Sequence, residues 1–363
     1  MIEGRLVELL RELVEIESPT RTPGVRVAAE RMAAELGALG GSAAILDGDH
    51  VRADFPGEGA PLVVLGHTDT VWPVGTLARL PFRVEGPRAR GPGVYDMKAG
   101  LVTILAALAE PAVAKRPRRP LRVLITADEE QGSVSARPHI AEVARGAAAA
   151  LVVEPCLPGG GVKVARKGIG RFTLTVHGRA AHAGTQPSPG ISAIEELARQ
   201  IVHLHGLADL ARGISVNVGV IRGGTAENVI AERAEARIDV RISRHDHAAE
   251  LEAALRALLP SLAGARHEWS GEWTRPPLEA SAGSALLFAA AARHGRELGL
   301  ELVQGSSGGG SDGNLIGALG VPVLDGLGPD GAGAHAETEH VLLASIPERA
   351  RLLARLLGDP GVP

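Results

Sequence analysis

The stretch Pro61-Leu62-Val63-Val64-Leu65-Gly66-His67-Thr68-Asp69-Thr70 decides the fold class of this chain. Its apolar residues form a short continuous run, which is typical of a strand buried on both faces of a parallel sheet. His67 stands where this strand ends, and open α/β sheets bind their ligands at the carboxyl ends of strands. Side chains two residues apart in an extended chain point to the same side, so Asp69 can hold one ring nitrogen of His67 while the other binds a metal.

Four more candidate metal ligands follow in a similar pattern. Asp96 precedes an apolar helical repeat at residues 97–110, where an Asp can also serve simply as an N-cap. The other three each follow a further apolar run, at residues 121–126, 150–153 and 322–324: they are Glu130, Glu154 and His335. Because parallel strands end at one edge of a sheet, we expect the five side chains to meet there.

Two histidines and three carboxylates without a cysteine suit divalent zinc, cobalt or manganese. One carboxylate can bridge two metals about 3.5–4 Å apart, and a water between them loses a proton near neutral pH. Each metal would then have one histidine, one terminal carboxylate and a share of the bridge. Neighbours in an extended chain face opposite ways, so Glu129 is predicted to be the general base rather than a ligand beside Glu130.

The order and composition of these motifs resemble a known family. The resemblance covers nearly the whole chain and is to the dinuclear zinc amidohydrolases and exopeptidases, which include glutamate carboxypeptidase, acetylornithine deacetylase, succinyl-diaminopimelate desuccinylase and aminoacylase. It is strongest to the bacterial glutamate (folate-cleaving) carboxypeptidases. The segments that carry it are Asp69-Thr70-Val71, Leu80-Pro81-Phe82-Arg83-Val84-Glu85-Gly86, Asp128-Glu129-Glu130-Gln131-Gly132-Ser133 and Gly308-Gly309-Gly310-Ser311-Asp312.

The resemblance implies two zinc ions per chain, for which cobalt or manganese can substitute. By this resemblance one zinc is bound by His67 and the other by His335, with Asp96 as the bridge and Glu130 and Glu154 as terminal ligands.

Three neighbouring positions are read through the same resemblance. Asp69 would orient His67, and Glu129 would be the base. Met97 departs from the closest relatives, which often carry a second Asp there, but it is not an expected ligand. The family's cis peptide after the bridging Asp is expected here too, at a cost of about 3 kcal/mol for a bond that does not precede proline.

The chain is predicted to contain two domains, since 363 residues are too many for one ordinary core. Helices alternate with apolar runs up to residue 168 and again from 277, which indicates an α/β domain with a mostly parallel sheet and helices on both faces. Residues 169–276 instead alternate apolar and polar positions, as in Phe172, Leu174 and Val176. Their order of strand, helix, strand, strand, helix, strand predicts a smaller α+β, ferredoxin-like insert that acts as a lid and dimerisation domain.

The insert carries a second group of candidate residues. The resemblance implies that His182 reaches the active site of the partner subunit and stabilises the oxyanion there, whereas a histidine in a surface loop is the plain alternative. Asn228 and Arg241 match positions that touch substrate, although Asn228 also suits a turn and Arg241 also suits a strand partner of Asp239.

Two further segments suggest substrate contacts. Arg275 resembles an arginine that grips a substrate carboxylate, with a hinge arginine as the alternative. The loop with Gly309 and Gly310 lacks the following Lys-Ser/Thr of a phosphate-binding loop, so we interpret it as a wall that substrate approaches closely.

Composition excludes several classes of protein. A net charge of −4 without a basic stripe argues against nucleic acid as a partner. No run of 18 apolar residues is present, so no membrane span is expected. The amphipathic residues 2–17 carry charges that a signal peptide lacks, and a cytoplasmic location is expected by default. Cys156 is the only cysteine, which leaves no internal disulfide.

The sequence therefore predicts a metal-dependent hydrolase that cleaves an amide bond to an amino acid with a free carboxylate. A deacylase of N-acyl-amino acids, similar to acetylornithine deacetylase, is the alternative within the same chemistry. A metal-dependent binding protein without catalysis is the alternative from another class, and the presence of Glu129 argues against it.

Overall fold

The computed structural model describes residues 2–114 and 118–362, which divide into two compact units. The first unit comprises the chain up to Ala165, Glu279–Ser307 and the chain from Ser311. The second comprises Arg166–Leu278 together with Gly308–Gly310. The assignment of these three glycines to the second unit was not foreseen from the sequence, and the functional division into a catalytic and a lid domain remains a prediction.

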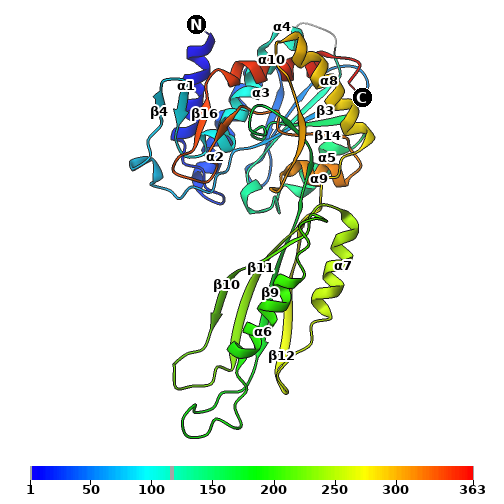
Figure 1. Ribbon diagram of the computed structural model, residues 1–363. Helices are drawn as coiled ribbons and strands as arrows, with labels where there is room; N and C mark the ends of the chain where they lie inside the picture. The colour runs from blue at the N-terminus through cyan, green and yellow to red at the C-terminus, as the bar shows by residue number, and fades with distance from the viewer. Residues whose placement is uncertain (1, 115–117, 363) are drawn as a thin grey trace. The chain divides into compact units, whose positions relative to one another are not determined.

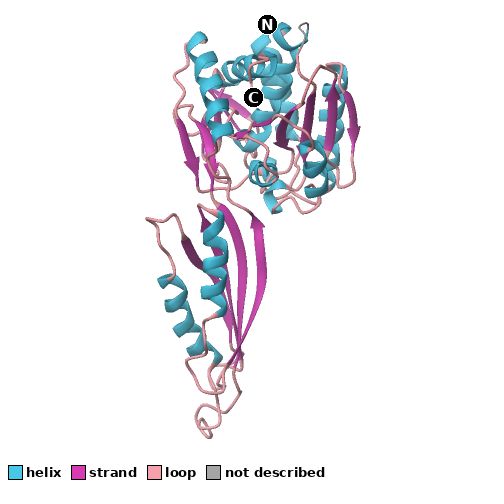
Figure 2. Cartoon of the chain, turned by 90° about the vertical axis from the view of Figure 1, so that its right-hand side faces the viewer, coloured by secondary structure: helices cyan, strands magenta, loops and turns pink. Residues whose placement is uncertain are grey.

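The first unit is built on a six-stranded sheet with helices on both faces (Figures 1 and 2). Strand β3 pairs in parallel with β6 and β7, and β7 pairs in parallel with β14, whereas β1 and β2 form an antiparallel edge. The strands, in their order across the sheet, are β1 (Ser42–Ile45), β2 (Val51–Phe55), β6 (Leu121–Thr126), β3 (Leu62–His67), β7 (Ala149–Val152) and β14 (Val323–Leu324). The predicted α/β class with a mostly parallel sheet is confirmed.

The centre of this sheet follows from its sequence. All six residues of β3 are buried, as expected for a strand covered on both faces. Helix α3 (Ala99–Ala109) is apolar almost all round and is correspondingly buried, with α1 and α10 packed against it. The other helices of the unit are α1 (Ile2–Glu15), α2 (Pro23–Ala38), α4 (Pro111–Ala114), α5 (Arg137–Ala144), α8 (Ala282–Glu297), α9 (Asp312–Ala318) and α10 (Ser345–Gly358).

Among the described residues, two smaller sheets and three short helical turns complete the first unit. The turns are η1 (Thr76–Ala78), the π-type turn η2 (Val94–Lys98) and η3 (Glu129–Gln131). One sheet joins β8 (Val162–Arg166) to β13 (Gln304–Ser307). The other has the order β15 (Gly331–Ala332), β16 (His340–Leu342), β5 (Arg88–Arg90), β4 (Arg83–Glu85).

The second unit is a four-stranded antiparallel sheet with α6 and α7 on one face (Figures 1 and 2). Its elements are β9 (Gly168–His177), α6 (Ala193–Gly206), β10 (Ser215–Gly223), β11 (Arg233–Ile242), α7 (His245–Arg256) and β12 (Arg266–Arg275), and the strands lie in the order β10-β11-β9-β12. The expected succession of strand, helix, strand, strand, helix, strand is observed. Phe172, Leu174 and Val176 are buried beneath the helices, as their alternation indicates.

The alternation expected in β10 stops before its end. Val216 is buried, but Val220 is 44% exposed. The pairing of β10 with β11 shifts its register between Val218 and Val220, and such a bulge turns the following side chains to the other face.

None of the helices in the described ranges combines the length and the apolar character that crossing a membrane requires.

Candidate metal centre

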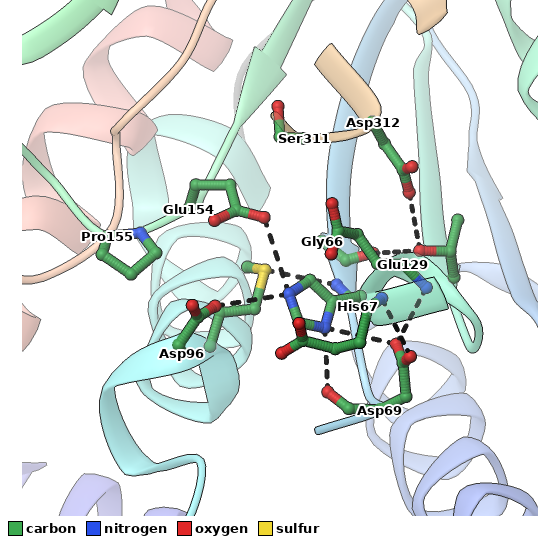
Figure 3. Close-up of polar contacts among 12 residues, drawn as sticks. Gly66, His67, Asp69, Asp96, Glu129, Glu154, Pro155, Ser311 and Asp312 are labelled. Carbon is green, nitrogen blue, oxygen red and sulfur yellow. Dashed lines mark hydrogen bonds and ion pairs between the residues drawn. The ribbon is translucent and has the colours of Figure 1, made fainter. Parts of the chain in front are cut away.

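His67 forms the buried end of a cluster of histidines and carboxylates in the first unit. It is the last residue of β3, and its side chain is 1% exposed. Its Nε2 lies 3.5 Å from Asp96 Oδ1 and 3.5 Å from Glu154 Oε1. Figure 3 shows the ring between these two carboxylates on one side and Asp69 on the other.

Asp96 faces both predicted histidine ligands. Its second oxygen, Oδ2, lies 3.4 Å from Nε2 of His335, which is also 3.3 Å from Oε1 of Glu130. Each oxygen of the Asp96 carboxylate therefore meets a different histidine, as a carboxylate that bridges two cations must do. The structure thus brings the five predicted ligands together in one cluster.

His335 reaches this cluster from a place that the sequence did not indicate. It was expected after the strand at 322–324, but it lies in the loop between β15 and β16, well beyond β14. Its backbone is left-handed, with φ of 63°, and its side chain is 49% exposed. The cluster therefore runs from a buried histidine to a half-exposed one, so that one end of it is open to solvent.

Asp69 contacts His67 and also holds the turn that carries Glu129. The Nδ1 of His67 lies 2.9 Å from the main-chain oxygen of Asp69 and 3.3 Å from its carboxylate. The Asp69 carboxylate accepts hydrogen bonds from the backbone N–H groups of Glu129 and Glu130, at 3.1 Å each, and from Thr20. Asp69 is fully buried, so it links β3 rigidly to the acidic turn.

The acidic turn is not the extended chain that was expected at Glu129 and Glu130. Glu129 and Glu130 lie in η3, a short 3₁₀ helix, and not in extended chain, so their side chains need not face opposite ways. Ligand atoms of His67, Asp96 and Glu130 lie within 4.8 Å of one another, and so do those of His67, Glu129 and Glu154. Distance alone therefore does not separate a base from a ligand among these carboxylates.

Asp96 and Met97 lie within η2, and the peptide bond between them is cis. Met97 is 1% exposed, and its sulfur accepts the backbone N–H of His67 at 3.3 Å. The Met97 side chain therefore packs between β3 and α3, next to the cluster.

The charges of the cluster favour a cation at its centre. Burial lowers the pKa of His67, but the contacts with Asp69, Asp96 and Glu154 outweigh it and hold that pKa well above its ordinary value. Contacts with Asp96 and Glu130 raise the pKa of His335 to about 10. Burial raises the pKa of Glu130 despite the neighbouring histidines. The site thus contains more negative charge than its two histidines offset.

Two buried atoms indicate where a metal fits. The carbonyl of Asp69 can only accept, so Nδ1 of His67 carries a proton, and Nε2 is the ring nitrogen that faces the carboxylates and could bind a metal. Nε2 of His67 and Oε1 of Glu130 are buried and form no hydrogen bond within the part of the chain that the structure describes. Bound cations would satisfy both atoms, and the nitrogen and oxygen donors suit zinc, cobalt or manganese. The residues present therefore fit a metal.

The remaining predicted site residues belong to the second unit. His182 is exposed in the loop after β9, and its Nδ1 accepts the backbone N–H groups of Gly184 and Thr185 at 3.1 Å each. Asn228 is exposed beside it, and its main-chain oxygen accepts the N–H of Ala183. The N–H groups of its own loop thus hold the His182 ring in one tautomer, with the proton of the neutral ring on Nε2.

The other four candidate positions, Arg241, Arg275, Gly309 and Gly310, lie elsewhere in that unit. Arg241 makes a bidentate pair with Asp239, at 2.7 and 3.0 Å, which matches the alternative raised from the sequence. Arg275 is 2% exposed and packs closely against Gly310. A Cβ at position 310 would lie only 2.7 Å from Cδ of Arg275, so the close approach requires glycine. The carbonyls of Gly309 and Gly310 accept hydrogen bonds from Arg166, a residue that the sequence analysis did not single out.

Sequence reasoning also missed two buried carboxylates near the cluster. Asp312 accepts hydrogen bonds from the hydroxyls of Thr126 and Ser133 and so connects the end of β6 to the chain that follows η3. Glu339 accepts four N–H groups, one from the side chain of Trp72 and three from the backbone of residues 93–96. Both carboxylates lie in polar stretches that resemble solvated loops, and no local pattern marks them as buried.

Comparison with known proteins places the chain in a family. The family model of peptidase family M20/M25/M40 matches residues 63–359. Carboxypeptidase G2 of Pseudomonas sp. is 32% identical over 373 residues, which cover 98% of this chain and 89% of that protein. Succinyl-diaminopimelate desuccinylase of Halorhodospira halophila is 32% identical over 362 residues, which cover 94% of each.

Solved structures share the fold at lower identity. Aminopeptidase PepT of Bacillus cereus has a TM-score of 0.83 at 21% identity, with 98% of each chain covered. The YXEP protein of Bacillus subtilis, described as a dinuclear metal binding peptidase from the M20 family, has a TM-score of 0.76 at 18% identity, with 98% of this chain and 97% of that one covered. The chain belongs to peptidase family M20/M25/M40 and is a metal-dependent hydrolase of that family.

Proposed function

We propose that this protein is a two-zinc amidohydrolase that releases an amino acid with a free carboxylate from an amide. The observation that carries the proposal is the Asp96 carboxylate, whose two oxygens face His67 and His335 separately. Glu154 and Glu130 would be the terminal ligands on the two sides. Two divalent ions held there would polarise the amide carbonyl and make a water more acidic, which is the chemistry that amide hydrolysis requires.

Glu129 is the proposed general base. It lies beside the ligands, and its position depends on Asp69, which holds its backbone N–H. A carboxylate in this place can take a proton from water and pass it to the leaving amine. Asp69 contributes by orienting His67 and the acidic turn together, and it need not exchange a proton itself.

His182 is the proposed donor to the oxyanion of the tetrahedral intermediate. Because its Nδ1 accepts two backbone N–H groups, its Nε2 is the ring nitrogen that can donate. A donor fixed before the reaction begins stabilises developing charge by about 3 kcal/mol or more.

We further propose a homodimer joined through the second unit, in which His182 serves the site of the other chain. β10 is an edge strand of its sheet, and Val220 and Ile221 on it are 44% and 62% exposed. An edge strand with exposed apolar side chains suits pairing with a second copy, which would be an isologous contact.

The substrate class is a small peptide-like amide. Similarity to carboxypeptidase G2 supports a glutamate-type leaving group, and similarity to a succinyl-diaminopimelate desuccinylase supports an N-acyl-amino acid as the alternative substrate. Among the candidates for substrate contact, Asn228 and Gly309 are exposed, while Gly310 is half-buried. Arg241 and Arg275 would have to leave or share their present surroundings, since one is paired and the other is buried.

Metal removal and a substrate screen test the proposal. Protein stripped by a chelator should lose activity and regain it with about two equivalents of zinc or cobalt per chain. The screen would compare N-acetyl, N-succinyl, N-benzoyl and pteroyl amino acids, and the released acid or amino acid identifies the bond that is cut. Full activity in a stripped sample would contradict the proposal.

A further inference from the structure

Glu339 is a buried carboxylate that no step of the proposed reaction uses. Its side chain lies in the loop that follows His335, and it is 3% exposed. Its Oε2 accepts Nε1–H of Trp72 at 2.8 Å and N–H of Gly93 at 3.1 Å. Its Oε1 accepts the backbone N–H groups of Tyr95 and Asp96, at 2.9 and 3.1 Å. All four donors are N–H groups, so each carboxylate oxygen is shared by two of them.

These contacts fix the backbone on which Asp96 is carried. Asp96 lies inside η2 with non-helical backbone angles, φ of −114° and ψ of 95°, so regular helical hydrogen bonding does not hold it there. Three N–H groups of residues 93–96 converge on Glu339 instead. Convergent backbone N–H groups bind anions, and here the anion is a side chain of the same protein.

The same residue restrains the loop of His335. The N–H of Ala336 donates to the carbonyl of Gly333, and the N–H of Glu339 donates to the carbonyl of Ala336. Glu339 therefore follows two consecutive turns that begin at Gly333 and include His335. Its carboxylate ties the end of this loop to the segment that carries Asp96.

We propose that Glu339 is a positioning residue that sets the distance between Asp96 and His335 and so determines metal affinity on the His335 side of the centre. This inference rests on the proposed metal function. Ligands must be held within about half an ångström of productive geometry, and the residues that hold them affect metal binding nearly as strongly as the ligands do. The side chain contacts neither the substrate nor the reacting atoms.

Glu339→Gln is an informative substitution because its shape is almost unchanged. Each oxygen of the Glu339 carboxylate accepts two N–H groups in the wild-type protein. In glutamine, whichever way the amide is turned, an NH₂ group takes the place of one of these oxygens and faces its two N–H donors. Two donors would lose their acceptor, and the segment before Asp96 would shift away. We expect the apparent affinity for the weaker-bound metal to fall by about 10- to 100-fold.

Glu196 provides a matched control. It is also fully buried, and it accepts N–H groups from Ser261, Leu262, Gln200 and His267 within the second unit. Glu196, like Glu339, is a buried carboxylate that accepts hydrogen bonds from four residues. Glu196→Gln therefore makes the same chemical change at a place that does not contact the metal cluster. A purely structural role for Glu339 predicts that both variants lower the unfolding temperature and leave metal affinity unchanged.

The experiment is a titration of metal-stripped, full-length protein with cobalt(II), followed by visible absorption, with circular dichroism as the check on folding. The expected result is wild-type affinity for Glu196→Gln and weakened binding of one cobalt for Glu339→Gln. Two cobalt ions bound by Glu339→Gln with wild-type affinity would overturn the inference. A wild-type protein that binds no cobalt would instead contradict the proposed metal function. If Glu339→Gln does not fold, Trp72→Phe decides, because it removes one of the four donors: weaker cobalt binding supports the inference, and wild-type binding overturns it.

Discussion

Glu129 and Glu130 are adjacent carboxylates with different surroundings, and their substitutions should have different effects. Glu130 Oε1 lies 3.3 Å from His335, within the set of five predicted ligands. Glu129→Gln should keep the metals and lower kcat by about 10² or more, because general-base catalysis is lost. Metal analysis after gel filtration, together with initial rates at saturating substrate, measures both effects.

Glu130→Gln should show the opposite pattern, with weaker metal binding at the His335 side and recovery of activity when excess zinc is added. The pair of variants controls for the loss of one negative charge, since both lose it. If Glu129→Gln loses metal while Glu130→Gln retains it, the two roles are exchanged. The grouping of Glu129 with His67 and Glu154 by distance makes this comparison necessary.

The residue types of the cluster were predictable because His67, Glu130 and Glu154 follow strands that end at one edge of the sheet. The surroundings of these residues were not predictable. Asp69 was expected to hold His67 by its carboxylate, but its closer contact is through the main-chain oxygen, and its carboxylate holds η3. Burial of Glu339 depends on segments distant in sequence, and no local pattern shows it.

Glu196 joins α6 to the chain that leaves α7, and it should make the second unit sensitive to acid. Burial raises the pKa of Glu196, but the N–H donors of Ser261, Gln200 and Leu262 and the contact with His267 outweigh it and lower the pKa below its ordinary value. A folded-state pKa below the unfolded value stabilises the fold at neutral pH. This stabilisation is lost as the pH falls through the ordinary carboxylate range and below it.

Glu196→Gln should therefore lower the free energy of unfolding by about 1–3 kcal/mol near pH 7, because a buried hydrogen-bond acceptor is lost. The difference from wild type should be smaller near pH 3, because the wild-type carboxylate becomes protonated there whereas glutamine does not titrate. Urea unfolding of both proteins at several pH values measures the difference. Glu250→Gln on α7 is the control, since Glu250 is exposed and paired with Arg212. If the loss of unfolding free energy in Glu196→Gln were the same at every pH, the predicted role of Glu196 in acid sensitivity would be wrong.

The elements themselves followed the sequence pattern closely. The apolar run of β3 and the alternation in β9 and β11 predicted buried and one-sided strands, and both are observed. The exceptions have local physical causes. A bulge exposes Val220, and η3 replaces the extended chain expected at Glu129, because hydrogen bonds to Asp69 close the turn. Such features depend on partners from other segments.

The order of elements along the whole chain allowed the insert to be recognised from sequence, since strict alternation begins where the parallel pattern stops. The attachment of Gly308–Gly310 to the second unit was not recognisable, because it depends on hydrogen bonds from Arg166 and Arg241 across more than sixty positions of sequence. The proposed pairing of two chains likewise depends on a surface, and a sequence pattern alone does not specify which edge strand meets a partner.

The proposed dimer makes a prediction about mixed subunits. His182→Ala removes the oxyanion donor, and Glu129→Gln removes the base, so each homodimer should be nearly inactive. If His182 serves the partner chain, a heterodimer of the two variants has one site with an intact Glu129 and an intact His182, while its other site has neither. Random exchange at equal amounts makes half of the dimers mixed, so activity should recover to about a quarter of the wild-type value.

The measurement is the rate of substrate hydrolysis before and after subunit exchange. Mass spectrometry of differently tagged chains verifies that exchange has occurred. Wild type mixed with Glu129→Gln controls for exchange that damages the protein. Absence of recovery despite complete exchange would place His182 in the site of its own chain or outside catalysis, because only action across the interface lets two inactive chains complement each other.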